Sequence, residues 1–230
     1  MSGLLTEYEA KVSEILVYFD FLENLLEKDA RLYFPRGRKQ KFAECSDELL
    51  KILKANAFLL LYNLIESSVR NGITKIYDAV RTEGLSYTGV CDELRTIWTY
   101  QQFLPDGARR AENNAKRLME LISFVLDAEL ISLDARDLPI AGNVDAEQIR
   151  ILAQKYGFRF NASPKLKGGY LLKRVRDERN GLAHGYKSFV ESGRDLTYEG
   201  LLEIRKQVIP YLRQVLRGID RFISQRGYAA

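Results

Sequence analysis

Histidine is almost absent from this 230-residue chain, which contains a single one, His184. The two cysteines, Cys45 and Cys91, lie far apart and form no Cys-x-x-Cys pair. A structural zinc ion needs four thiolate or imidazole ligands, so we expect no such centre, although this argument does not extend to a magnesium ion held by carboxylates. Two distant cysteines also argue against a secreted disulfide scaffold and suit a reduced cytoplasm.

Long apolar segments are also missing. The longest uninterrupted apolar run, residues 57–62, is far shorter than the ~20 residues that a transmembrane helix needs. Residues 1–7 contain no basic segment and no cleavage site of the kind found in signal peptides. We therefore expect a cytoplasmic protein that makes no contact with membranes.

Strict alternation of apolar and polar residues, which marks half-buried strands, is absent over more than a few positions. Apolar residues instead recur every three or four positions, and Ser46 and Thr197 suit helix N-caps. We predict an all-α bundle forming one domain, residues 1–230, with a small helical insertion around 130–165. Residues 29–45, which include Pro35 and Gly37, are predicted as a loop. The expected helices are 4–28, 46–70, 73–80 after a break or bend at Asn71-Gly72, 86–104, 108–130, 146–156, 170–186 and 197–222.

The net charge of +4 is modest, but the basic residues are clustered. One cluster contains Arg36, Arg38, Lys39 and Lys41, and a second runs through Lys165, Lys167, Lys173, Arg174, Arg176 and Arg179. Such clusters suit a phosphate-bearing partner, whereas charge runs on their own are more often solvated faces. If the partner is RNA, Lys173, Arg174 and Arg176 are the residues that we expect to bind its phosphates.

The second cluster leads into residues 177–186, which bring Arg179, Asn180, His184 and Tyr186 together. On a helix, Arg176, Asn180 and His184 share one stripe, because they are spaced by four residues. The stretch also holds Gly181 and Gly185, which would cost roughly 2 kcal/mol against alanine inside a helix. Close approach of a second copy across a two-fold axis would explain both glycines. A helix end near position 185 would explain Gly185 alone.

These side chains could carry out metal-free cleavage of RNA. The reaction needs a base for the 2′-hydroxyl proton, an acid for the leaving 5′-oxygen and positive charge beside the phosphorane-like transition state. The guanidinium of Arg179 suits the last role, and an imidazole suits proton transfer. Because the chain has only His184, a pair of histidines would have to come from two subunits. The simpler alternative is that His184 is a helix cap or a core residue.

Residues 179–184, Arg-Asn-Gly-Leu-Ala-His, resemble the signature of the HEPN family, in which four to six residues separate Arg from His. The resemblance extends over essentially the whole chain, through residues 62–67, 143–146, 156–158, 183–189 and 193–197. It implies a helical bundle that dimerises through the motif helices. Active members are metal-independent endoribonucleases of toxin–antitoxin, phage-defence and RNA-processing systems. By this resemblance Arg179 and His184 would be catalytic, Asn180 would support them, and no cofactor would be needed.

The resemblance suggests two further residues. In many members an acidic residue on the preceding core helix positions the motif, and Glu66 is the candidate here, unless it is simply an exposed acid. Tyr186 completes an Arg-x4-His-x-Tyr pattern that is adenylylated in toxins paired with a nucleotidyltransferase antitoxin; otherwise its phenol packs or stacks on RNA. Two alternatives to a nuclease stay open: a non-catalytic dimer that binds RNA or nucleotides, and a module that binds a partner protein.

Overall fold

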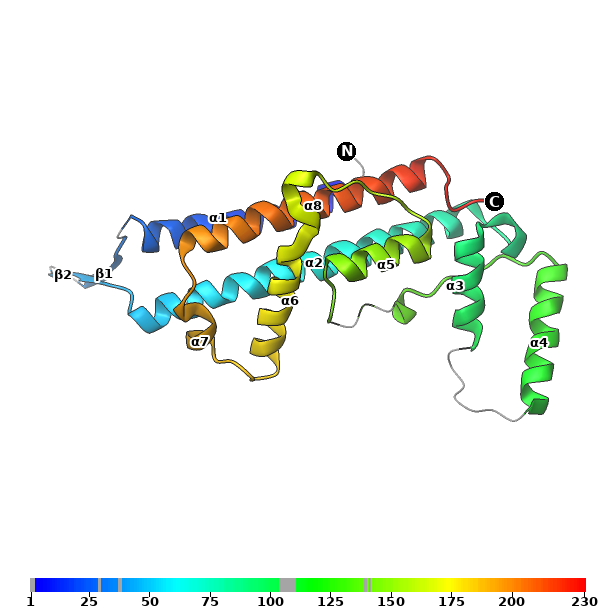
Figure 1. Ribbon diagram of the computed structural model, residues 1–230, viewed down its shortest axis with the longest axis horizontal. Helices are drawn as coiled ribbons and strands as arrows, with labels where there is room; N and C mark the ends of the chain where they lie inside the picture. Colours follow the sequence, from blue (N-terminus) through cyan, green and yellow to red (C-terminus); the bar gives the residue numbers. More distant parts are fainter. Residues whose placement is uncertain (1–2, 29, 37–38, 104–110, 139, 141) are drawn as a thin grey trace.

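The chain folds as an all-α protein, as predicted, in the computed structural model, which describes residues 3–28, 30–36, 39–103, 111–138, 140 and 142–230 (Figure 1). Within these residues there are eight α-helices, three short 3-10 helices and one two-stranded antiparallel sheet. The α-helices are α1 Gly3–Leu26, α2 Asp47–Glu83, α3 Asp92–Phe103, α4 Ala111–Leu126, α5 Ala146–Tyr156, α6 Tyr170–Ala183, α7 Phe189–Arg194 and α8 Tyr198–Ser224. The 3-10 helices are η1 Tyr87–Gly89, η2 Ala135–Asp137 and η3 Pro164–Gly169, and the strands are β1 Leu32–Arg36 and β2 Lys39–Ala43.

The three longest helices, α1, α2 and α8, lie side by side and form the body of the molecule (Figure 1). The buried residues of α1 follow the three- and four-residue spacing of the sequence, and Phe19 and Leu22 are completely buried. Burial of each such side chain contributes roughly 1.5–3 kcal/mol. The Tyr8 hydroxyl donates a hydrogen bond of 2.6 Å to the Ile209 carbonyl and so joins α1 to α8.

Helix α2 is continuous from Asp47 to Glu83, so the predicted break at Asn71-Gly72 is wrong. Gly72 is buried, and a Cβ atom there would lie 2.5 Å from the Ile219 side chain of α8. Glycine at this position therefore allows α8 to pack closely against α2, and tertiary packing outweighs its low helix propensity. The start of α2 was predicted correctly: the Ser46 hydroxyl accepts a 3.2 Å hydrogen bond from the Leu49 N–H.

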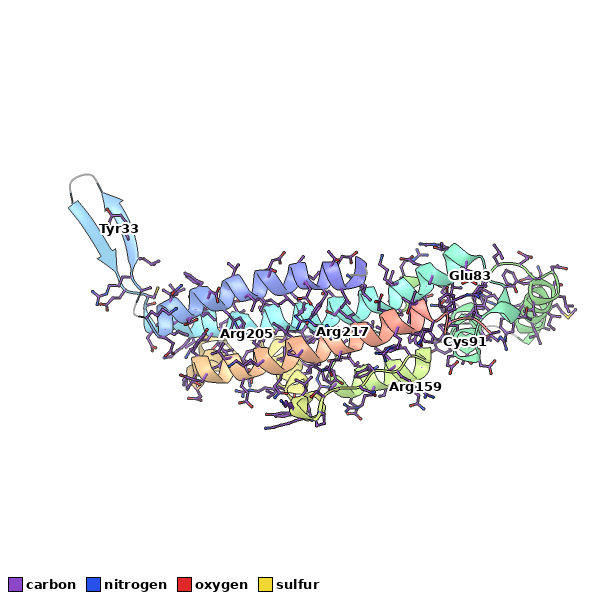
Figure 2. All side chains as sticks on the ribbon, turned by 90° about the horizontal axis from the view of Figure 1, so that it is seen from above. Tyr33, Glu83, Cys91, Arg159, Arg205 and Arg217 are labelled. Atoms are coloured by element: carbon purple, nitrogen blue, oxygen red, sulfur yellow. The ribbon has the colours of Figure 1, made fainter. Side chains whose placement is uncertain are left out.

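The predicted loop at 29–45 instead contains the antiparallel strands β1 and β2, which is a correction. Cα pairing runs from Leu32–Ala43 to Arg36–Lys39, so only two residues connect the strands. Pro35 and Gly37 suggested a loop, but proline is tolerated on the edge strands that both members of a two-stranded sheet are. Figure 2 shows this hairpin projecting beyond the end of the helical body.

The other boundaries depend on local capping. Helix α5 has the predicted bounds because Asp145 caps its start and Gly157, with φ +77°, ends it. Helix α3 begins later than predicted, at Asp92, and the predicted helix 108–130 is seen as α4, Ala111–Leu126. Residues 104–110, which include the first residues of the predicted helix 108–130, lie outside the described residues. Helix α7 was not predicted, and α8 ends at Ser224, two residues after the predicted end.

One continuous cluster of buried apolar side chains includes residues from α1, α2, α3, α5, α6 and α8. The single-domain assignment and the insertion at 130–165 remain predictions. In the described part of the chain, no helix is both long enough and apolar enough to cross a membrane.

Candidate active site

Helix α6 carries the Arg179–His184 segment across the long helices and packs against α2 and α8 (Figure 1). The buried face of α6 follows the apolar periodicity of the sequence and consists of Leu171, Leu172, Val175, Gly181 and Leu182. The opposite face exposes Lys173 and Arg174 to solvent. The helix is therefore fixed by its apolar side, and its polar side is available to a ligand.

The helix ends at Ala183, three residues earlier than predicted, with His184 at the C-cap. The His184 N–H donates to the Asn180 carbonyl at 3.0 Å, and the Lys187 N–H donates to the Gly181 carbonyl at 3.1 Å. Gly185 follows with φ +71°, a left-handed conformation that glycine adopts without steric cost. This turn stops the helix and leaves the His184 side chain exposed at its end.

The turn also explains why positions 181 and 185 are glycine, without a second copy of the chain. A Cβ atom on Gly181 would lie 3.3 Å from the Lys187 side chain, which folds back over the helix end. Gly185 lies beyond the helix, so the two glycines do not share a helical face. The glycine pair therefore gives no argument for a two-fold contact, and dimerisation stays a proposal that depends on the family resemblance.

Arg179 is held by groups from three segments. Its guanidinium lies 4.0 Å from the centre of the Tyr62 ring and donates a hydrogen bond of 3.3 Å to the Glu66 carboxylate, both on α2. It also donates to Asn180 Oδ1 at 2.7 Å. A Cβ atom on Gly142 would lie 3.1 Å from both terminal nitrogens of Arg179, so the backbone of the loop before α5 also lies close to the guanidinium. The Arg179 side chain retains 22% exposure.

The loop before α5 is itself tied to both helices. The Val144 N–H donates to the Tyr62 hydroxyl at 3.1 Å, and Asn180 Nδ2 donates to Asn143 Oδ1 at 2.8 Å. Burial raises the pKa of Tyr62 above its ordinary value. Arg70 donates to the Ile140 carbonyl at 2.9 Å and lies 3.7 Å from Glu66. The position of Arg179 is therefore set by a network and not by one ion pair.

Three basic residues of α6 were predicted to bind RNA, and their surroundings differ. Lys173 and Arg174 are exposed. Arg176 is partly buried and forms ion pairs with Asp145 and with Asp177. Because the Asp145 side chain also caps α5 through the Gln148 N–H at 2.9 Å, Arg176 links α6 to the start of α5.

His184 and Tyr186 lie together on the exposed turn. Their ring centres are 5.8 Å apart with the planes inclined by 36°, and Tyr186 is 83% exposed. An imidazole in this position can exchange protons with a molecule bound at the surface. Along α6, the five-residue separation from Arg179 corresponds to roughly 7.5 Å at the helical rise.

Four residues of this network were not identified from the sequence as members of the site: Tyr62, Arg70, Gly142 and Asn143. Tyr62 and Glu66 are spaced by four on α2, so one helix face presents the ring and the carboxylate together. That spacing and the family resemblance over residues 62–67 and 143–146 were signals in the sequence, although neither assigned these residues to the site. In the described residues, no group of three or more His, Cys, Asp or Glu side chains has the arrangement to hold a metal ion.

The comparisons with known proteins agree with the resemblance noted in the sequence. The family model HEPN_MAE_28990-like HEPN matches residues 1–228. Neither the curated proteins nor the solved structures gave a significant match. A match over nearly the whole chain shows that this protein belongs to the HEPN family.

Proposed function

We propose that this protein is a metal-independent endoribonuclease of a toxin–antitoxin or phage-defence system, and that its active site is shared by two copies of the chain. HEPN domains are often ribonucleases or nucleotide-binding domains. The reaction is attack of a ribose 2′-hydroxyl on the adjacent phosphate. The expected products carry a 2′,3′-cyclic phosphate and a 5′-hydroxyl.

The observation that carries the proposal is a guanidinium, Arg179, held in place on α6, with an exposed imidazole, His184, at the end of the same helix. The bonds to Glu66 and Asn180 use two of the five guanidinium N–H hydrogens. The others are left for two phosphate oxygens, which Arg binds as a planar fork. A donor held in place before the reaction stabilises developing charge without reorganising, which is the condition for efficient electrostatic catalysis.

His184 transfers protons in this mechanism. Cleavage needs both a base and an acid, and each chain contributes one imidazole. We therefore propose a homodimer in which two His184 side chains face one RNA strand, one as base and one as acid. The exposed position of His184 at the end of α6 leaves it accessible to a second copy.

Asn180 and Glu66 act as positioning residues for Arg179, since both bond directly to its guanidinium. Lys173 and Arg174 contact RNA phosphates from the exposed face of α6. Arg176 contributes by holding α6 against the start of α5, and any contact with phosphate is made through the part of its side chain that remains exposed, 21%.

Tyr186 offers a means of control. A phenol that is 83% exposed and beside His184 is accessible to a modifying enzyme. Adenylylation of Tyr186 by a nucleotidyltransferase antitoxin would add bulk and negative charge at the site and so repel RNA. Mass spectrometry of the chain purified with and without its neighbouring gene product would show the added nucleotide, and an unmodified Tyr186 in both samples would contradict this mode of control.

The second candidate is a HEPN dimer that binds RNA, nucleotides or a partner protein without cleaving anything. One observation favours it: Arg179 already pairs with the Glu66 carboxylate and is mostly covered, as a structural arginine would be. RNA binding that persists in His184→Ala, with no cleavage by the wild type, would support this candidate.

The test is incubation of total cellular RNA with purified protein in the presence of EDTA, followed by analysis of the product ends. We expect cleavage by the wild type that EDTA does not inhibit. Tyr186→Phe is the control for a change on the same turn, and it should cleave like the wild type. Intact RNA in every wild-type sample would reject the nuclease.

A further inference from the structure

Glu178 lies directly before Arg179 on α6, and its carboxylate binds two groups that follow the end of the helix. Oε1 accepts a hydrogen bond of 2.8 Å from Lys187 Nζ, and Oε2 accepts one of 2.8 Å from the Ser192 hydroxyl. The Glu178 side chain is only 18% exposed, although it carries a charge. A carboxylate that is mostly removed from water needs such donors, so these contacts differ from those of a solvated surface acid.

Lys187 reaches Glu178 by crossing the end of α6 over Gly181. A Cβ atom at position 181 would lie 3.3 Å from Lys187 Cδ and 3.4 Å from its Cγ, so a glycine there leaves room for the lysine side chain. Gly181 is within α6, where glycine is less favourable than alanine. Glu178 and Gly181 are three residues apart and lie on the same side of the helix. Two features of α6 therefore determine where the Lys187 side chain lies.

The turn between α6 and Lys187 carries His184. The Gly185 N–H donates to the Leu182 carbonyl at 3.3 Å, and the Lys187 N–H donates to the Gly181 carbonyl at 3.1 Å. The His184 side chain is exposed, and it contacts the ring of Tyr186 on the same turn. The position of the imidazole therefore follows the backbone of the turn, and a group that holds the turn also holds the imidazole.

Helix α7, which contains Ser192, is itself fixed on α2 (Figure 1). The Ser188 hydroxyl accepts a bond of 3.1 Å from the Glu191 N–H, and the Glu191 carboxylate accepts one of 2.7 Å from the Ser188 N–H, so both residues cap α7. A Cβ atom on Gly193 would overlap the Lys51 carbonyl oxygen, which shows how closely the backbones of α7 and α2 approach. The bond from Ser192 to α6 therefore comes from a helix that is already held in place.

An ion pair that only stabilises the fold is the simplest rival explanation. Lys187 is 49% exposed, and pairs that are open to solvent contribute little to stability because water and salt screen them. So small a gain does not explain why α6 has a glycine at position 181, where the Lys187 side chain crosses it. It also does not explain the second bond, from Ser192 to the other oxygen of Glu178.

We propose that Glu178 is a positioning residue for His184. By binding Lys187 and Ser192 it holds the turn of residues 184–188 against α6, and the turn keeps the imidazole at the end of that helix. Glu178 acts through the turn and makes no contact with RNA. Its role in cleavage rests on the proposed nuclease function, whereas its effect on the position of His184 does not.

The first measurement observes the imidazole directly by NMR. His184 is the only histidine, so its ring signals need no further assignment. In the full chain labelled at histidine and tyrosine, the nuclear Overhauser effect between the rings of His184 and Tyr186 reports the turn, since the ring centres are 5.8 Å apart. Tyr186→Phe identifies the signal by removing it. We expect the signal in the wild type and its loss in Glu178→Gln.

The matched control is Glu83→Gln, at the other end of the molecule (Figure 2). Glu83 also binds one hydroxyl and one cation, because it accepts a bond of 2.7 Å from Tyr228 and pairs with Arg226. This variant should keep the signal between the rings. Circular dichroism melting checks that the variants are folded, and Lys187→Met, which removes the amine from an exposed residue, repeats the test if Glu178→Gln does not fold.

The second measurement is the rate of RNA cleavage. Glu178→Gln should lower kcat about tenfold, because a misplaced catalytic group slows the chemical step. KM should not rise, since the substitution removes a negative charge and no contact with RNA. Adding Lys187→Met to Glu178→Gln should lower kcat no further, because the two residues act through one another. Lys187→Arg keeps the ion pair and should keep both kcat and the signal between the rings, whereas Glu83→Gln should cleave like the wild type.

A signal between the rings that persists in folded Glu178→Gln, is equally lost in Glu83→Gln, or is missing from the wild type would overturn the proposal. The two proposals can fail separately. A signal that depends on Glu178 in a chain that cleaves no RNA rejects only the nuclease. Cleavage by the wild type with an unchanged kcat in Glu178→Gln rejects only the positioning role.

Discussion

Arg179 and His184, the two ends of the Arg-x4-His segment, are both positioned by α6, but the Arg179 side chain is mostly covered and the His184 side chain is exposed. Arg179 contacts Tyr62, Glu66 and Asn180 and is mostly covered. His184 lies at the C-cap of α6, and its side chain is exposed. In the proposed mechanism, a single chain would therefore hold the phosphate-binding guanidinium in place, whereas it would only present the proton-transferring imidazole. The expected effects of substitutions on cleavage and on stability distinguish the role of Arg179 from that of His184.

The largest effect is expected for His184→Ala. Loss of general acid–base catalysis should lower the rate of RNA cleavage by about 10²–10⁴-fold. Stability should change by no more than about 0.5 kcal/mol, because the side chain is exposed and the backbone bond from the His184 N–H to Asn180 remains. Cleavage assays and urea unfolding measure the two quantities. Unfolding of the variant would show that His184 is structural.

Arg179→Ala should affect both activity and stability. Removal of one preorganised donor to the transition state should slow cleavage by about 10²–10³-fold. It also leaves Glu66 without this partner and removes the cation–π contact with Tyr62, at a cost of about 1 kcal/mol. Arg179→Lys, which keeps the charge but loses the fork, should recover stability more than activity. Full activity in the lysine variant would contradict a bidentate role.

Glu66→Gln tests positioning. The substitution preserves the shape of the side chain but removes the charge that Arg179 and Arg70 both face. We expect cleavage to slow by about tenfold, and no further slowing when the substitution is added to Arg179→Ala, since residues acting through one another are not additive. Additive losses in the double variant would show that Glu66 acts independently of Arg179.

The smallest effects concern the turn that presents His184. Gly185 has φ +71° with open space around it, so Gly185→Ala should cost about 1 kcal/mol through backbone strain alone. Gly168, with φ +66° and equally open surroundings, is the matched control. Both variants should lose similar stability in urea unfolding, but only Gly185→Ala should slow cleavage. Equal cleavage by the two variants would mean that the turn does not position His184.

The ends of a helix could be predicted where residues next to them in the sequence set those ends. Ser46, Asp145 and Thr197 cap the helices that follow them, and Gly157 ends α5, as their types indicate. The continuity of α2 through Asn71-Gly72 could not be predicted from local sequence. Glycine is needed at position 72 because the Ile219 side chain packs against it, and Ile219 lies far along the chain. The hairpin was missed since its strands are too short to show alternation over several residues.

The candidate site was predictable only in part for the same reason. The segment from Arg179 to His184 is contiguous, so its residue types and spacing identify it. The network around Arg179 joins residues separated by more than one hundred positions, as Arg179 and Glu66 are. Glu66 was selected from the family resemblance, and the structure places it in contact with Arg179. Tyr62 and Gly142 act through the shape of the packed helices, which local sequence does not encode.

The central claim is that one chain fixes Arg179 whereas the proton-transfer half is completed by a second copy. The most direct test is the cleavage rate per chain, measured at protein concentrations on both sides of the dimer dissociation constant found by sedimentation. We predict that the rate per chain rises in proportion to the dimer fraction and that His184→Ala dimers stay inactive. Cleavage at an unchanged rate per chain where the protein is monomeric would contradict the account.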